Sequence, residues 1–335
     1  MTMFDRLKHR VVQAPMAGVS TPALAAAVAE AGGFGFVALG AIDAGAAREQ
    51  IAATRQQTSQ PIGVNLFCHR PQARNPELEA KWLAKLAPDF ARFDAEPPKA
   101  LRDIYPSFVE NDAMLAALVE LQPAVVSFHF GLPRADQISA LRDAGAMLWA
   151  TATSVEEAQA IKDAGIDVLV AQGWQAGGHR GMFDPDAPDE RLETLALVRA
   201  LKPLGLPVVA AGAIMDRNDA RAAIEAGAVA VQCGSAFLLS PEAGTTQPHR
   251  KAMSEQQTVM TKAISGRPAR GLSNLFTRID DSGTPGYPHT YDAGKALIAA
   301  AKAKGETGYG AYWAGTEAAR AVARPAAETV AAISP

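Results

Sequence analysis

The sequence predicts an α/β protein: a closed (β/α)8 barrel of parallel strands with a smaller, mostly helical second domain over its mouth. Short apolar runs recur along the chain, and most are followed by an alanine-rich segment that ends at glycine. Glycine-containing phrases follow the seventh and eighth runs, where barrels of this kind bind phosphate. Two longer stretches fall outside the repeat and supply the second domain.

Eight apolar runs have the length and composition of buried strands, and they alternate with segments of helical composition. The expected strands are 11–14, 35–39, 62–67, 124–128, 147–150, 168–171, 208–211 and 229–232. The clearest expected helices are 22–30, 44–55, 135–143, 155–163 and 217–225. Glycine follows four of them, where a left-handed C-cap favours it. An open doubly wound sheet is the alternative, but eight units and the phosphate pattern favour a barrel.

The repeat divides the chain into a barrel, residues 1–67 and 121–240, and a capping domain, residues 68–120 and 241–335. The insertion 68–120 is far longer than one connecting helix requires, and the tail has helical composition at 293–304 and 315–324. Active sites of such barrels lie at the C-terminal ends of the strands. We therefore expect the second domain to cover the substrate there.

Composition argues against several classes of function. The chain has 335 residues, 48% of them hydrophobic, and its net charge of −3 lacks the basic excess that nucleic-acid binding needs. No apolar run reaches the length of a membrane span, and residues 1–10 are not followed by a signal-peptide core, so we expect a cytoplasmic protein. Cys68 and Cys233 have no metal-ligand spacing and are expected to be reduced structural thiols, with no metal site.

Two phrases form the candidate phosphate site. Ala-Ala-Gly-Ala, which contains Gly212, ends the seventh strand, and Gln-Cys-Gly-Ser-Ala, which contains Gly234 and Ser235, ends the eighth. Glycine lets backbone N–H groups approach phosphate oxygens, and Ser235 adds a hydroxyl donor. The pattern indicates a phosphorylated ligand without identifying it, and glycines that only make tight turns are the alternative.

The segment 172–181, after the sixth strand, contains the candidate catalytic residue. Gln172 opens it, and Gly177 and Gly178 directly precede His179. Flexible glycines fit a loop that approaches a flat ligand and presents an imidazole, which can act as a base or a hydrogen-bond donor near neutral pH. A histidine on a surface loop is the alternative.

Four further candidates stand at predicted strand ends. Ala14 and Met16 follow the first strand, where their backbone could line a ring system, although a turn before a helix cap explains them better. Asn65 ends the third strand as a ligand contact or as a cap of its own backbone. His129 ends the fourth strand, where a pocket wall and a core histidine are equally good interpretations.

Tyr287, Tyr291 and Lys295 recur at a spacing of four residues, which predicts one helical face. Two phenols and an ammonium group suit an anion such as a carboxylate or a nitro group. An amphipathic face that packs on the barrel is the alternative.

Taken together, these segments resemble the nitronate monooxygenases, formerly called 2-nitropropane dioxygenases, and their bacterial class I subgroup in particular. The matching segments span the barrel in order: QAPMAGVST at 13–21, GVNLF at 63–67, SFHFGLP at 127–133, QGWQAGGHRG at 172–181, AAGAI at 210–214 and GSAF at 234–237.

The resemblance implies noncovalently bound FMN and a set of site residues. Contacts to FMN are implied for Met16, Asn65, Gln172, Gly177, Gly178, Gly212, Gly234 and Ser235. His179 would lie beside the reactive flavin edge, and Tyr287, Tyr291 and Lys295 would hold the substrate's anionic end. Tyr105, in the insertion, resembles a family tyrosine at the substrate pocket.

The resemblance further implies that alkyl nitronates, with propionate 3-nitronate as a candidate, react with O2 to give oxo compounds plus nitrite or nitrate through a flavin semiquinone. The alternatives are an FMN-dependent NAD(P)H:quinone or enoyl-thioester reductase, a barrel that binds sugar phosphates, and a flavin-binding protein without activity. The small-molecule partners are the nitronate and O2, and the chain is expected to be a monomer or homodimer.

Two residues depart from the family pattern. Gln175 replaces a glutamate in the histidine loop, and we expect its neutral side chain to leave His179 less basic. Ala213 replaces the second glycine after the seventh strand, where one methyl group could shift the phosphate slightly.

Overall fold

The main sheet of the protein is a barrel of eight parallel strands. The computed structural model describes residues 3–255 and 257–335. Its strands are β1 (Val11–Gln13), β2 (Phe36–Ala38), β3 (Gly63–Phe67), β4 (Val125–His129), β5 (Met147–Ala152), β6 (Val168–Gln172), β8 (Val208–Ala211) and β9 (Ala230–Cys233). Their order is β1-β9-β8-β6-β5-β4-β3-β2, and a parallel bridge between Val12 and Phe34 joins the two edges. The predicted barrel is therefore confirmed.

Helices surround the strands, and their ends agree with local sequence signals. The helices of this ring are α1 (Pro22–Glu30), α2 (Ala44–Arg55), α4 (Asp112–Leu121), α5 (Ala135–Asp143), α6 (Val155–Asp163), α7 (Thr194–Leu201), α8 (Arg217–Ala226) and α11 (Ala326–Ile333). Thr21 caps α1 by accepting a hydrogen bond from the Leu24 N–H. Positive φ angles at Gly32, Gly145 and Gly227 confirm the predicted glycine caps.

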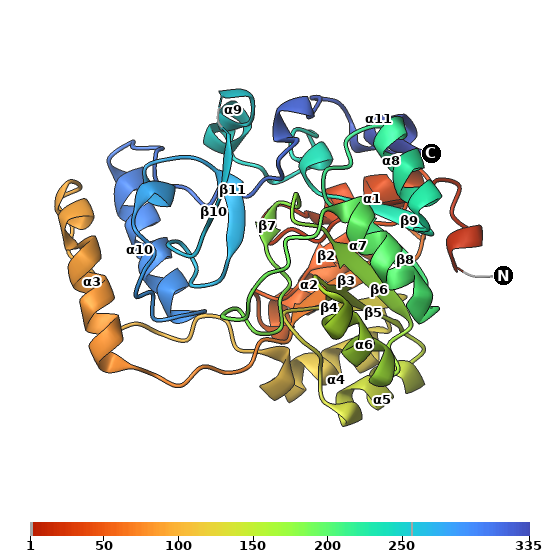
Figure 1. Ribbon diagram of the computed structural model, residues 1–335, viewed down its shortest axis with the longest axis horizontal. Helices are drawn as coiled ribbons and strands as arrows, with labels where there is room; N and C mark the ends of the chain where they lie inside the picture. Colours follow the sequence, from red (N-terminus) through yellow and green to blue (C-terminus); the bar gives the residue numbers. More distant parts are fainter. Residues whose placement is uncertain (1–2, 256) are drawn as a thin grey trace.

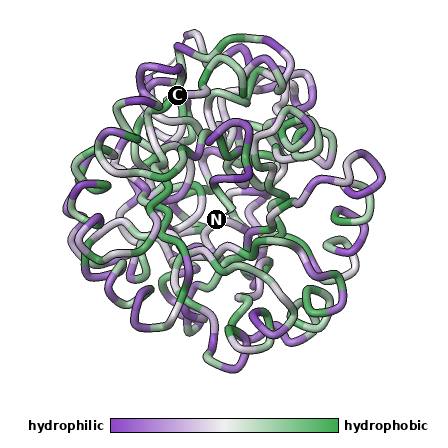
Figure 2. The backbone as a smooth tube through the Cα atoms, turned by 90° about the vertical axis from the view of Figure 1, so that its right-hand side faces the viewer, coloured by the Kyte–Doolittle hydropathy of each residue, from purple (hydrophilic) through white to green (hydrophobic). Residues whose placement is uncertain are grey.

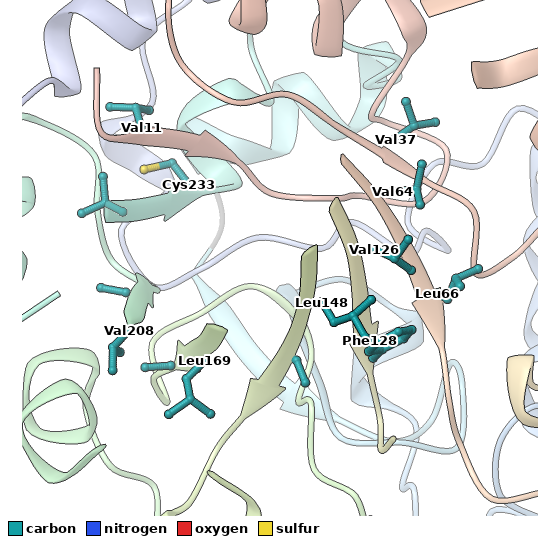
Figure 3. Packing of buried hydrophobic residues seen from close by; sticks show 14 of the residues in the cluster. Val11, Val37, Val64, Leu66, Val126, Phe128, Leu148, Leu169, Val208 and Cys233 are labelled. Atoms are coloured by element: carbon teal, nitrogen blue, oxygen red, sulfur yellow. The ribbon is translucent and has the colours of Figure 1, made fainter. Parts of the chain in front are cut away.

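The main core lies between the strands and this ring of helices. Figure 3 shows its side chains projecting from successive strands, among them Val64, Val126, Leu148 and Leu169. A second cluster fills the barrel interior around Trp149, which is fully buried. In the end-on view of Figure 2, hydrophilic segments lie mostly in the outer loops and many hydrophobic ones run inside the ring.

A third hydrophobic cluster lies outside the barrel. It joins α3 (Pro76–Ala91) to α10 (His289–Ala303) through buried residues that include Trp82, Leu86, Phe90 and Leu297. Figure 1 shows α3 and α10 on the opposite side of β10 (Thr258–Thr261) and β11 (Ala269–Leu272) from the barrel. This cluster is built from the insertion and the tail, and the division into two domains remains a prediction.

Several predicted boundaries differ from the structure. Residues 315–324 contain only the short 3-10 helix η6 (Ala318–Arg320), and the following helix, α11, packs against α1 and α8 of the barrel. Pro325 is the N-cap of α11, and its ψ of 146° lies outside the helical region, so α11 begins as a separate helix after the preceding segment. α4 likewise packs between α2 and α5, so part of the insertion also belongs to the ring of barrel helices.

The tail also contributes strands to a region expected to be mostly helical. β10, β11 and the two-residue strand β7 (Gly178–His179) form an antiparallel sheet, in which Ala269 pairs with His179. The tail is thus paired directly with the loop of the candidate catalytic histidine. The remaining helices are α9 (Gln247–Glu255) and the 3-10 turns η1 (Met3–Asp5), η2 (Phe108–Glu110), η3 (Lys202–Leu204), η4 (Ser235–Phe237) and η5 (Phe276–Arg278).

Within the described part of the chain, no helix combines the length and the apolar character needed to cross a bilayer.

Candidate active site

A cavity of about 680 Å³ opens at the C-terminal ends of the barrel strands, between the barrel and the tail. It brings together residues far apart in the sequence, as the barrel fold requires. The predicted site residues on its wall are Ala14, Met16, Asn65, Tyr105, His129, Gln172, Gly177, Gly178, His179, Gly212, Gly234, Ser235 and Tyr291. Tyr287 and Lys295 are not among the lining residues.

One end of the cavity is lined by backbone without bulky side chains. Gly212 has a φ of +122°, and the following Ala213 has a φ of +54°, in the left-handed region. The Ser235 hydroxyl accepts a hydrogen bond from the Gly315 N–H at 2.8 Å, which leaves its own proton free to be donated to a ligand. This end has the amide and hydroxyl donors that bind an anion such as phosphate.

The space around Gly234 shows whether this part of the cavity fits a ligand. Its φ is −107°, and a Cβ atom added there would meet nothing closer than the Met16 sulfur at 3.5 Å. The packing of the chain itself therefore does not require glycine at this position. A ligand lying directly against the backbone would require it, so the residues present fit a phosphorylated group.

His179 lies on the wall of the cavity, in β7. Its carbonyl oxygen accepts hydrogen bonds from Gln172 Nε2 at 2.8 Å and from His129 Nε2 at 3.2 Å. Its ring Nε2 lies 2.9 Å from the hydroxyl of Ser265. Hydrogen bonds therefore hold His179 both at its backbone carbonyl group and at its imidazole ring.

The amide of Gln172 is used within this loop. Its Nε2 donates to the His179 carbonyl oxygen, and its Oε1 accepts a hydrogen bond from the Gly181 N–H at 2.7 Å. Arg180, whose side chain is 1% exposed, donates to the carbonyl oxygens of Gln172 and Gly173 and pairs with Asp189 at 2.8 Å. These bonds give the glycine-rich loop a defined shape without a ligand.

Both histidines of the site are neutral at physiological pH. Burial, together with the charge of Arg267, lowers the pKa of His129 to about 4. Burial first, and then His129 and Arg267, lower the pKa of His179 to about 3. Because a carbonyl oxygen only accepts hydrogen bonds, His129 carries its proton on Nε2, and its Nδ1 accepts from Thr151.

The tyrosines gather around His179, although not through the helical face that their spacing predicts. Tyr287 precedes α10, which begins at His289, so only Tyr291 and Lys295 share a helical face. The ring centroids of Tyr287 and Tyr291 nevertheless lie 6.1 and 6.0 Å from that of His179. Burial raises the pKa of Tyr291 to about 12, so its phenol remains protonated and can donate.

Lys295 reaches the site only through Tyr105. Its side chain is exposed, and its Nζ lies 2.7 Å from the Tyr105 hydroxyl. Tyr105 in turn packs edge-on against Tyr291, with ring centroids 5.6 Å apart. Lys295 therefore orients a tyrosine of the cavity wall rather than lining the cavity itself.

The Gln175 side chain does not contact His179. Its oxygen accepts the backbone N–H of Thr194 at 2.9 Å and lies 3.1 Å from the Thr194 hydroxyl, at the start of α7. No hydrogen bond of the described residues thus connects this side chain with the His179 imidazole, and its effect on the basicity of His179 stays a prediction. In this structure Gln175 caps a helix.

Sequence reasoning missed four residues of the site. Ser265 and Arg267 come from the turn between β10 and β11, and Trp313 comes from the tail, with its ring centroid 5.2 Å from that of His179. His69 packs edge-on against Tyr287 at 4.8 Å. None of them belongs to a recognisable motif. Trp313 lines the cavity, whereas Ser265, Arg267 and His69 are not lining residues and reach the site through the side chains that they contact.

No group of three His, Cys, Asp or Glu side chains among residues 3–255 and 257–335 could hold a metal ion.

A sequence model of the nitronate monooxygenase family matches residues 1–334. The chain belongs to the nitronate monooxygenase family. Nitronate monooxygenases from Paraburkholderia phytofirmans and Pseudomonas aeruginosa are 53% and 49% identical to it, each over 96% of this chain and over 90% and 94% of their own lengths. Membership of this family makes the chain an oxidoreductase and implies a flavin cofactor.

A solved structure agrees with this assignment. The nitroalkane oxidase from Streptomyces ansochromogenes superposes with a TM-score of 0.91 at 37% identity, covering 99% of this chain and 96% of that protein. The similarity extends over both the barrel and the tail, and so includes the segments that surround the cavity.

Proposed function

We propose that this protein is an FMN-dependent nitronate monooxygenase that oxidises alkyl nitronates with O2 to oxo compounds plus nitrite or nitrate. The observation that carries the proposal is the cavity, whose wall combines glycine backbone near Ser235 with His179, Tyr105 and Tyr291. One nitronate and one O2 balance as one oxo compound and one nitrate, and two nitronates and one O2 balance as two oxo compounds and two nitrites.

The cavity wall suggests how FMN would be held. Backbone N–H groups near Gly212 and Gly234, with the Ser235 hydroxyl, would bind the phosphate. Met16 and Asn65 also line the cavity and would contact the rest of the FMN molecule. The bound flavin would supply the electron transfer between nitronate and oxygen, while the chain supplies orientation and electrostatics.

The electrostatics around His179 favour an anionic substrate. Arg267 is 3% exposed, and its guanidinium lies 4.3 Å from the ring centroid of Phe130, which packs against His179. Burial lowers the pKa of Arg267 to about 10, so the side chain remains charged at neutral pH. The charges of Asp184, Asp186 and Glu157 act on Arg267, but no carboxylate of the described residues forms a direct ion pair with it, and its positive charge favours an anion such as a nitronate.

The same surroundings make His179 a weak base. A general base works best with a pKa near the working pH, and the pKa of His179 is about 3. Proton abstraction from a neutral nitroalkane is therefore disfavoured, whereas a nitronate has already lost that proton. The preferred substrate is thus the nitronate itself, with propionate 3-nitronate as the candidate to test.

Oxygen uptake with propionate 3-nitronate, measured on the FMN-loaded protein, tests the proposal. The parent should consume oxygen rapidly, and His179→Asn should lose about 100-fold in kcat/KM while it retains its flavin, because the imidazole that orients the ligand is lost. His9→Asn, at the opposite end of the barrel, is the matched control and should behave as the parent. Unchanged turnover in His179→Asn would remove this residue from the mechanism.

Anaerobic mixing with NADH separates this function from that of an FMN-dependent reductase. A nitronate monooxygenase should leave the flavin absorbance largely unchanged under these conditions. Rapid bleaching by NADH, together with no oxygen uptake in the presence of nitronate, would favour the reductase.

A further inference from the structure

The turn between β10 and β11 brings a hydroxyl group from the tail to the candidate catalytic imidazole. Ser265 is completely buried, and its Oγ lies 2.9 Å from His179 Nε2. These two residues are 86 positions apart in the sequence. The contact exists because β11 pairs with β7, with Ala269 opposite His179.

The partners of Ser265 decide which ring nitrogen of His179 carries the proton. A hydroxyl group donates one hydrogen bond and accepts two. The Arg267 carbonyl oxygen, 3.3 Å away, can only accept, and the Arg267 N–H, 3.4 Å away, can only donate. All three partners are satisfied when Ser265 donates to that carbonyl and accepts from both the Arg267 N–H and His179 Nε2–H.

The other ring nitrogen then faces the cavity. His179 is partly exposed and lines the cavity, and no described residue forms a hydrogen bond with its Nδ1. With the proton held on Nε2, Nδ1 presents a lone pair to a bound ligand. We propose that Ser265 is a positioning residue, which holds His179 in the Nε2–H tautomer and keeps its Nδ1 directed into the cavity.

The turn that carries Ser265 is built to hold it in place. Arg267 donates to the carbonyl oxygens of Met182 and Phe183, at 2.7 and 3.2 Å, just beyond the histidine loop. Gly266 has a φ of +86°, and a Cβ atom there would lie 2.4 Å from the Gly286 backbone. The turn is therefore held between the loop after β7 and the tail segment at Gly286, which limits movement of the hydroxyl.

The catalytic part of this inference rests on the proposed function, but the tautomer can be measured without turnover. Nitrogen-15 NMR of protein labelled at histidine distinguishes a protonated from an unprotonated ring nitrogen, and His179→Asn identifies the signals of His179. We expect the parent to show Nε2–H and Ser265→Ala to show a mixture of tautomers. A parent that carries the proton on Nδ1 would overturn the proposal.

The kinetic readout separates positioning from stability. In Ser265→Ala, kcat for propionate 3-nitronate should fall about tenfold, the loss expected for one hydrogen bond, while KM changes little. Ser265→Cys keeps a weaker donor and acceptor and should give an intermediate tautomer ratio and rate. Ser240→Ala is the matched control because Ser240 is also completely buried but its hydroxyl has no hydrogen-bond partner among the described residues.

The outcomes distinguish the two proposals. A mixture of His179 tautomers in Ser265→Ala supports the positioning role even if the parent oxidises no nitronate, a result that would overturn only the proposed function. An unchanged His179 tautomer in both Ser265 variants, with rates equal to that of Ser240→Ala, would exclude the positioning role.

Discussion

Arg267 is the residue whose surroundings bear most directly on substrate charge. A buried cation without an ion pair is costly unless its hydrogen bonds are satisfied, and Arg267 donates to two carbonyl oxygens. Its charge therefore remains in the structure and acts on the histidines and tyrosines around the cavity.

Replacement of Arg267 by Lys and by Met separates charge from hydrogen bonding. Both variants lose the forked contact to the carbonyls, so both should be less stable to heat than the parent. Only Arg267→Met loses the charge, and its KM for propionate 3-nitronate should exceed that of Arg267→Lys by about tenfold. Steady-state kinetics at low salt measure the difference, and equal KM values would mean that this charge does not act on the substrate.

Gly234 provides a test of the cofactor site at the same scale. Gly234→Ala should leave the melting temperature of the FMN-free protein nearly unchanged, because the new methyl group meets only ordinary contacts. The methyl group should clash with a bound phosphate, so the Kd for FMN should rise by about tenfold or more. Gly145→Ala is the reverse control, since a φ of +91° should make it less stable without changing FMN affinity.

At the scale of helices and strands, the start of α7 shows why the role of Gln175 cannot be interpreted from its sequence motif alone. Gln175 lies only four positions before His179 in the sequence, yet its side chain turns away to the Thr194 N–H. Periodicity also misplaced Tyr287, which lies beside Tyr291 without sharing its helix. In both cases the backbone path decides the direction of a side chain that sequence spacing leaves open.

Gln175→Glu should therefore change stability rather than catalysis. A carboxylate at the N-terminus of α7 interacts favourably with the helix dipole, and the free energy of unfolding should rise by about 0.5 kcal/mol. Gln175→Ala should lower it by about 1 kcal/mol through loss of the bond to Thr194. Denaturant titration measures both. A shifted pH profile of nitronate oxidation in Gln175→Glu would show instead that the carboxylate acts on His179.

At the scale of the whole molecule, buried neutral histidines connect stability to pH. Burial lowers the pKa of His69 and of His249 from 6.5 to about 4. Below pH 6.5 the unfolded chain therefore binds more protons than the folded one. The stability contributed by these neutral side chains is complete above pH 6.5 and is lost as the pH falls towards 4.

The melting temperature should accordingly fall steeply between pH 6.5 and pH 4.5. Each of these histidines contributes a loss of up to about 1.4 kcal/mol per pH unit. His249→Phe keeps the ring packed against Tyr312, 5.2 Å away, but removes one titrating group, so its curve should be shallower. Calorimetry across this range provides the measurement, and parallel curves would mean that His249 does not contribute.

The sequence by itself determined the barrel, its strand order along the chain and the residues at the strand ends that line the cavity. Strands buried on both faces, helix caps and glycine turns are local signals, and the fold places the ends of all its strands at one mouth. Ala14, Asn65, His179 and Ser235 could be predicted for this reason.

Only the tertiary structure decided how the tail completes the site. Ser265 and Arg267 reach the site through the pairing of β11 with β7, and α11 returns to the barrel although the sequence assigned it to the cap. The hydrogen bond between His179 and Ser265 joins residues 86 positions apart, and a single sequence contains no periodic pattern that would indicate it. Its energy comes from packing and hydrogen bonding that exist only once the chain has folded.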